Sequence, residues 1–279
     1  FPARFETRQD QAAWIHDLAT PAGSLVAGAE LVRQRVLPQA KDTGEPVHPT
    51  DRRETRSAFA SWNEAWRGQR VEASVRRDDD EQYGSRNTSA VSVAGQATGG
   101  GTRAVVTVAR GFRVPTVNDL YLALPGHTPN PGLRPERSRS RELSLRGAWG
   151  PLSEWRLTGF DSRLEDLIVF SPSAGTVMNL ARARVRGLEL RFEATWLATR
   201  WRGAFTWQRP KDEETGARLQ TRASRFGSFE ASRSWGSWTA GLSMVGSGER
   251  FDSIDESPGS RLPSYVRVDA RLRYDISKA

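Results

Sequence analysis

Repeated stretches of this chain alternate, residue by residue, between apolar and polar side chains. In the clearest one, the apolar residues Leu188, Leu190 and Phe192 are interleaved with Glu189 and Arg191. Successive side chains of a β-strand point to opposite sides of a sheet, so such a stretch separates an apolar environment from an aqueous one. The same pattern recurs at 71–76, 142–149 and 266–274. This alternation favours strands over helices along most of the chain.

The polar face carries full charges in one stretch after another, and this indicates which class of sheet the strands form. A soluble sheet also alternates, but a charged inner face in successive strands is typical of a large water-lined barrel with lipid outside. Of the 279 residues, 37% are hydrophobic and 27% are charged. No run approaches the roughly 18 apolar residues of a membrane helix. Barrel strands hide their apolar half in the alternation, so hydropathy alone gives a weak signal.

Strand and loop lengths predict an antiparallel up-and-down transmembrane β-barrel, which is an all-β fold. Connections alternate between short turns and long loops, as expected when turns face the periplasm and loops face outward. Long loops are predicted at 37–51, 79–86, 112–137, 164–183, 209–220 and 247–263. Strands are predicted near 5–19, 23–36, 52–65, 69–78, 87–95, 102–111, 138–149, 153–163, 184–196, 199–208, 221–232, 236–246 and 264–274.

This strand count predicts an incomplete barrel. Closed bacterial barrels have an even number of strands. The chain is therefore expected to supply about thirteen strands of a barrel of roughly 22. The whole of 1–279 is expected to be part of a single barrel domain, with strands missing at both ends.

Composition excludes several classes of function. The net charge is +8, but the arginines are scattered singly, so nucleic-acid binding is not predicted. Cysteine is absent, which excludes disulfides and thiolate metal sites. The ten Trp lie mostly near predicted strand ends, where a membrane-interface girdle places them.

The predicted loop 112–137 and its flanks carry the most specific motif. The segments GFRVPTVNDLY at 111–121 and NPGLRPERS at 130–138, followed by Glu142, resemble a stretch of TonB-dependent outer-membrane receptors. A second match, NLARARVRGLE at 179–189, resembles a strand start of the same family. The family residues matched are Pro115, Asp119, Leu120, Tyr121, Asn130, Pro135, Glu136, Ser138, Glu142, Asn179, Gly187 and Glu189. We expect Gly187 to leave room for something packed inside the barrel.

Three further segments resemble the cobalamin receptors of this family more than its siderophore or haem receptors. They are 74–84, 179–184 with Ala181 in place of glycine, and 219–223 with Thr221 in place of arginine. The resemblance implies a bacterial outer-membrane receptor, surrounded by outer-membrane lipid, that imports a small-molecule ligand such as cobalamin. Family members draw energy from TonB through a plug domain, which is absent from this chain. The resemblance implies no enzyme activity.

The predicted ligand-binding residues are Tyr83, Tyr121 and Arg222. Tyrosines offer flat apolar surface to a macrocycle, and arginine can grip phosphate with two parallel hydrogen bonds. The alternative interpretation is structural: tyrosines of the interface girdle, and an arginine paired to a wall glutamate.

Metal and catalytic chemistry have weaker support. The acidic run Asp78–Glu81 could bind calcium or could be a solvated loop, and no cofactor is predicted. The histidines, at 16, 48 and 127, lack ligand spacing, so no metal site is predicted. No catalytic residues are predicted, because no nucleophile motif occurs; an outer-membrane hydrolase remains the enzyme alternative.

Overall fold

A computed structural model describes residues 3–40, 52–97, 101–122, 126–150, 153–254 and 256–276. Thirteen strands form one sheet in the order β1 to β12 followed by β15, each beside its neighbour in sequence. The predicted all-β, up-and-down arrangement is therefore confirmed. These strands are β1 (Ala3–Thr20), β2 (Gly23–Ala40), β3 (Arg52–Trp66), β4 (Gln69–Asp80), β5 (Gly84–Gln96), β6 (Arg103–Arg113), β7 (Glu136–Gly147), β8 (Ser153–Ser171), β9 (Thr176–Trp196), β10 (Thr199–Asp212), β11 (Arg225–Trp235), β12 (Trp238–Ser247) and β15 (Tyr265–Tyr274).

Four small elements lie in the connections. Helix α1 (Val117–Tyr121) follows β6, and a 3-10 turn (Pro258–Ser260) precedes β14. Strands β13 (Arg250–Phe251) and β14 (Arg261–Leu262) pair only with each other. Among the described residues, no helix is long and apolar enough to cross a membrane.

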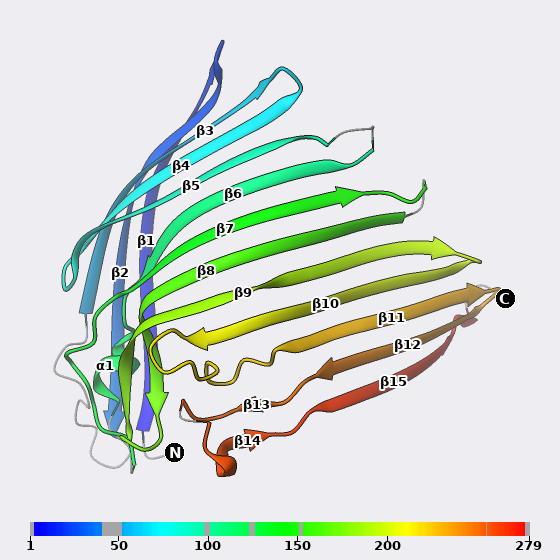
Figure 1. Ribbon diagram of the computed structural model, residues 1–279. Coiled ribbons are helices and arrows are strands. Elements are labelled where there is room, and N and C mark those ends of the chain that lie inside the picture. The colour runs from blue at the N-terminus through cyan, green and yellow to red at the C-terminus, as the bar shows by residue number, and fades with distance from the viewer. Residues whose placement is uncertain are drawn as a thin grey trace. The chain divides into compact units, whose positions relative to one another are not determined.

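The chain forms two compact units. The first contains residues 1–93, 107–140 and 163–182, and the second contains 94–106, 141–162 and 183–279. In the first unit, β1 to β4 are antiparallel neighbours, and they run side by side in Figure 1. Helix α1 belongs to the same unit and lies in the connection between β6 and β7.

In the second unit, the registers of β9 to β12 and β15 place apolar residues on one face. Leu188 is paired with Trp207, and Met244 is paired with Val268. These side chains are exposed despite being apolar: the exposed fraction is 51% for Leu188 and 54% for Val268. On soluble proteins, a contiguous apolar surface of this kind is rare, because it costs free energy in water.

The opposite face of these strands carries the charged residues, and they are paired with one another. Arg191 Nε lies 2.7 Å from a carboxylate oxygen of Glu189, and Arg202 Nε lies 3.3 Å from Glu193. Arg200 also binds Glu193. The predicted alternation between an apolar and a charged face is therefore confirmed here.

Two predicted long loops are wrong, because strand pairing continues through them. The loop predicted at 164–183 is a hairpin extension: β8 runs to Ser171 and β9 begins at Thr176. The loop predicted at 79–86 is likewise a tight turn between β4 and β5. In the first case Ile168, Phe170 and Val177 pack in an apolar cluster, which stabilises pairing beyond the alternating stretch. The predicted loop 37–51 lies mostly outside the described residues.

Exposed tryptophans flank the short turns of the sheet. Trp66 precedes a turn in which Arg67 and Gly68 both have positive φ, and Trp196 precedes a similar turn at 197–198. Such φ values suit two-residue hairpin turns of the primed types. The exposed fractions are 54% for Trp66 and 66% for Trp196. Their position agrees with the predicted girdle at strand ends.

Candidate functional site

The connection between β6 and β7 is an ordered structure built around α1. Thr116 begins the helix: its hydroxyl accepts a hydrogen bond from Asp119 N at 3.1 Å, and Asp119 Oδ2 accepts one from Thr116 N at 2.8 Å. This reciprocal capping box satisfies two backbone donors that a short helix leaves free. The helix buries Leu120 completely in a cluster with Leu133 and Val177.

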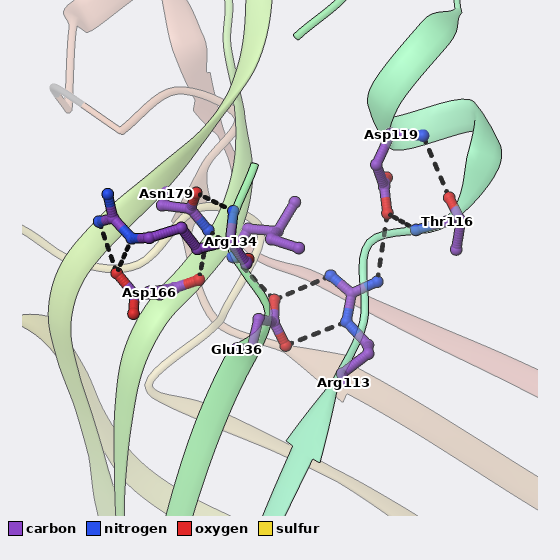
Figure 2. A network of polar contacts seen from close by, with 8 residues as sticks. Arg113, Thr116, Asp119, Arg134, Glu136, Asp166 and Asn179 are labelled. Carbon is purple, nitrogen blue, oxygen red and sulfur yellow. Dashed lines mark hydrogen bonds and ion pairs between the residues drawn. The ribbon is translucent and has the colours of Figure 1, made fainter. Parts of the chain in front are cut away.

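Glu136, the first residue of β7, ties the loop to its base. Its two carboxylate oxygens accept hydrogen bonds from Arg113 Nε at 3.0 Å and Nη2 at 2.8 Å, a bidentate pair. The remaining Arg113 nitrogen, Nη1, lies 3.4 Å from Asp119 of the helix. Glu136 also accepts the backbone N–H of Ile168 at 2.7 Å. The buried carboxylate of Glu136 thus joins β7 to β6 and β8, and Arg113 extends the link to Asp119 of α1 (Figure 2).

Asn179 of β9 attaches the β6–β7 loop to the sheet at a second point. Its Oδ1 accepts a hydrogen bond from Arg134 N at 2.9 Å, and its Nδ2 donates to Arg134 O at 3.0 Å and to Asp166 O at 2.7 Å. The guanidinium of Arg134 in turn binds the Asp166 carboxylate at 2.6 Å (Figure 2). Asp166 has a φ of 57°, a strained conformation for a residue with a side chain. The network fixes this conformation from both sides.

Asn130 makes a third attachment, beside the buried cluster. Its Nδ2 donates to Val177 O at 2.9 Å, while its Oδ1 accepts from Gly132 N at 3.1 Å. Pro115 and Pro135 are buried at the two ends of the loop. The described parts of the loop are therefore fastened to the β8–β9 hairpin at several points, through the polar groups named above.

Most of the motif residues predicted from the sequence are brought together by this loop. They are Pro115, Asp119, Leu120, Tyr121, Asn130, Pro135, Glu136 and Asn179. Ser138 of β7 stands beside Gly111, whose added Cβ would lie 3.1 Å from the Ser138 hydroxyl. Sequence reasoning missed four partners that complete the network: Arg113, Thr116, Arg134 and Asp166.

The other three motif residues belong to the second unit. Glu142 is exposed on β7, and Glu189 binds Arg191 on the charged face of β9. A Cβ on Gly187 would lie 2.2 Å from Trp207 O and 2.9 Å from the ring of Phe160. Glycine is thus required for close approach of backbone within the sheet, and the space beside it is already filled by Phe160.

Tyr83 has a buried hydroxyl without a hydrogen-bond partner among the described residues. It lies in the turn after β4, where the Arg53 guanidinium stands 5.6 Å from the ring centroid. Burial raises the pKa of Tyr83 to about 12. The positive charge of Arg53 opposes this increase in pKa, and Tyr121 adds to it. The phenol therefore stays protonated at neutral pH and can donate a hydrogen bond.

The other two predicted ligand contacts differ in their surroundings. Tyr121, at the end of α1, is half-buried against the Leu120 cluster. Arg222 is exposed in the connection between β10 and β11. Tyr121 lies in the first unit with Tyr83, and Arg222 lies in the second.

The acidic run at the end of β4 is used by local hydrogen bonds. Asp78 accepts from Ser57 Oγ at 2.7 Å, and Asp80 accepts from the backbone N–H of Gln82 and Tyr83, each at 3.0 Å. Asp79 accepts from Ser85 Oγ at 2.9 Å. Within the described ranges, no group of three His, Cys, Asp or Glu residues is arranged to hold a metal ion.

Comparison with known proteins gives one family and several relatives. Residues 3–279 match the family described as TonB dependent receptor-like, beta-barrel. The Vitamin B12 transporter BtuB of Vibrio vulnificus (strain YJ016) is 26% identical over 284 residues, which cover 99% of this chain and 44% of the relative. The chain thus spans less than half the length of that relative.

Solved structures share the fold at lower identity. A mutant of the ferric enterobactin receptor from Pseudomonas aeruginosa, in complex with enterobactin, is 18% identical with a TM-score of 0.78, covering 99% of this chain and 47% of the other. The copper transporter OprC is 15% identical with a TM-score of 0.78, covering 98% of this chain and 49% of the other.

Proposed function

Because this chain belongs to the TonB-dependent receptor-like β-barrel family, we propose that it is the wall of an outer-membrane receptor that imports cobalamin. The observation that carries the membrane assignment is the exposed apolar face of β9 to β12 and β15, opposite a face of paired charges. Lipid would cover the apolar face, so its exposure would cost nothing in a bilayer. The charged face would line a hydrated bore, where the ion pairs need not be desolvated.

The choice of cobalamin rests on similarity to a Vitamin B12 transporter over 99% of this chain. Segments 74–84, 179–184 and 219–223 support it, because they resemble cobalamin receptors. The likeness to a ferric enterobactin receptor, at 18% identity, supports the fold alone. Energy would come from TonB through a plug domain, as the family resemblance implies.

In this proposal, the β6–β7 loop presents Tyr121 to the ligand from a fixed position. The carboxylates around it are occupied by arginines, so they hold the loop and do not act as acids or bases. Tyr83 would contribute its unpartnered hydroxyl as a donor to an amide or phosphate oxygen of the ligand. Arg222 remains a predicted phosphate contact, because a guanidinium can bind phosphate with two parallel hydrogen bonds.

The test is binding of cyanocobalamin to the full-length receptor, measured by calorimetry in detergent. We expect saturable binding, and Tyr83→Phe is expected to weaken it about tenfold, since one hydrogen bond is worth about 1 kcal/mol or slightly more. Tyr274→Phe is the matched control, because Tyr274 lies on the apolar face and packs at a tilt against Trp238. Binding of a ferric siderophore in place of cyanocobalamin would refute the choice of ligand.

A further inference from the structure

Four cationic side chains gather on the apolar face of β9 to β11, at the end next to the β10–β11 connection. We call them the basic cluster: Arg186, Arg209, Lys211 and Arg225. Arg186 and Arg209 are direct cross-strand partners, and Arg225 is the partner of Trp207, two residues along β10 from Arg209. Strand alternation places all four on the same face as Leu188 and Trp207.

The basic cluster has no internal charge compensation. All four side chains are exposed, and none makes a hydrogen bond or an ion pair within the described part of the chain. Like charges directly opposite each other on neighbouring strands are destabilising. The adjacent Arg184 differs, because its guanidinium binds Asp161 at 2.8 Å. An anion between Arg186 and Arg209 would remove the repulsion.

An apolar groove of about 610 Å³ adjoins the cluster. Its floor contains the direct cross-strand partners Gly227 and Gly246. The ring of Phe205 lies over Gly227, whereas Gly246 leaves a gap in the row of side chains. Phe205, Trp207, Phe229, Met244 and Val266 line the groove, and Arg225 links it to the basic cluster. A flexible hydrocarbon chain fits such a gap, because burial of each CH₂ contributes about 0.8 kcal/mol.

We propose that this surface binds a phosphorylated membrane lipid, with the phosphate on the basic cluster and an acyl chain in the groove. A neutral lipid would leave the four cations unpaired, and a free phosphate would leave the groove empty. Arginine pairs hold phosphate bidentately, and basic pockets beside membrane-spanning elements hold lipid headgroups. The proposal rests on the proposed function, because it requires lipid to meet this face.

The test uses the full-length receptor in neutral detergent, titrated with dimyristoyl phosphatidic acid and followed by native mass spectrometry. We expect bound lipid on the parent protein and at least a tenfold loss of affinity in the double variant Arg186→Gln, Arg209→Gln. Gly246→Leu is expected to lower affinity similarly by filling the groove. A Cβ added to Gly246 would lie 3.6 Å from Tyr265 O and from Val266 Cγ2, which is ordinary van der Waals contact. The strand therefore has room for the added Cβ.

Arg233→Gln is the matched control, since Arg233 is exposed on the same face of β11 at the opposite end. It is expected to leave the affinity unchanged; an equal loss would show general electrostatic attraction and overturn the site. Equal binding of dimyristoyl phosphatidylcholine, or inorganic phosphate competing as well as the lipid, would also overturn it, as would no binding. Cyanocobalamin binding measured on the same samples separates failure of this proposal from failure of the proposed function.

Discussion

Replacing Glu136 with glutamine is expected to release the β6–β7 loop from the sheet. The neutral amide loses the bidentate pair with Arg113 and points donor hydrogens at a guanidinium that has only donors. The Ile168 N–H loses a charged acceptor at the same time. Hydrogen bonds to charged groups are worth about 1.5–3 kcal/mol, and partial exposure of Arg113 favours a loss of about 2 kcal/mol.

Limited proteolysis of the full-length receptor measures this release, read as the rate of cleavage between residues 114 and 135. Glu189→Gln is the matched control, because Glu189 forms a more exposed pair with Arg191 on the sheet wall. Exposed pairs contribute about 0–1 kcal/mol, so that variant is expected to be cleaved at the parent rate. If Glu136→Gln is cleaved no faster than Glu189→Gln, the carboxylate does not hold the loop.

Replacing Met244 with arginine is expected to destabilise the protein in a bilayer by about 2–4 kcal/mol, the cost of a cation at mid-depth on the lipid face of a barrel. Met244 is flanked by Phe229 and Val268 on the apolar face of β12. The free energy of unfolding, measured by guanidinium titration of the receptor in lipid vesicles, should fall by this amount.

Ser243→Arg is the matched control, one residue away on the opposite face. Its cross-strand partners are Glu230 and Asp269, so an added guanidinium there gains opposite charges on both sides. We expect a change in unfolding free energy near zero or slightly favourable. Equal destabilisation by the two arginines would mean that both faces meet the same environment.

Alternation in the sequence was enough to predict the strands and their faces. The pattern from Leu188 to Glu193 depends only on adjacent residues, and a strand displays adjacent residues on opposite sides. The extent of β8 and β9 could not be predicted in the same way. Their outer ends are held by Phe170 and Val177 packing with Leu120, which is more than forty residues away in sequence.

The site was predicted in outline and not in its contacts. The motif identified Glu136 and Asn179, yet Arg113 lies 23 residues from Glu136 in sequence, and Arg134 lies 32 from Asp166. Asp166 had no local signal, because it follows Glu165 in a stretch that was predicted to be a loop. Asp166 has a positive φ and accepts hydrogen bonds from Arg134 and Asn179 in that conformation. Long-range ion pairs of this kind become visible only with coordinates.

Single-cysteine scanning of β9 tests the central claim most directly, since this chain contains no cysteine of its own. Thiol reporters would be placed in turn at each position from 188 to 193 of the receptor in lipid vesicles, then probed with a bilayer-embedded quencher and a water-soluble maleimide. Quenching at Leu188, Leu190 and Phe192, alternating with maleimide labelling at Glu189, Arg191 and Glu193, is the predicted result. Maleimide labelling at all six positions, with no quenching at any, would contradict the account.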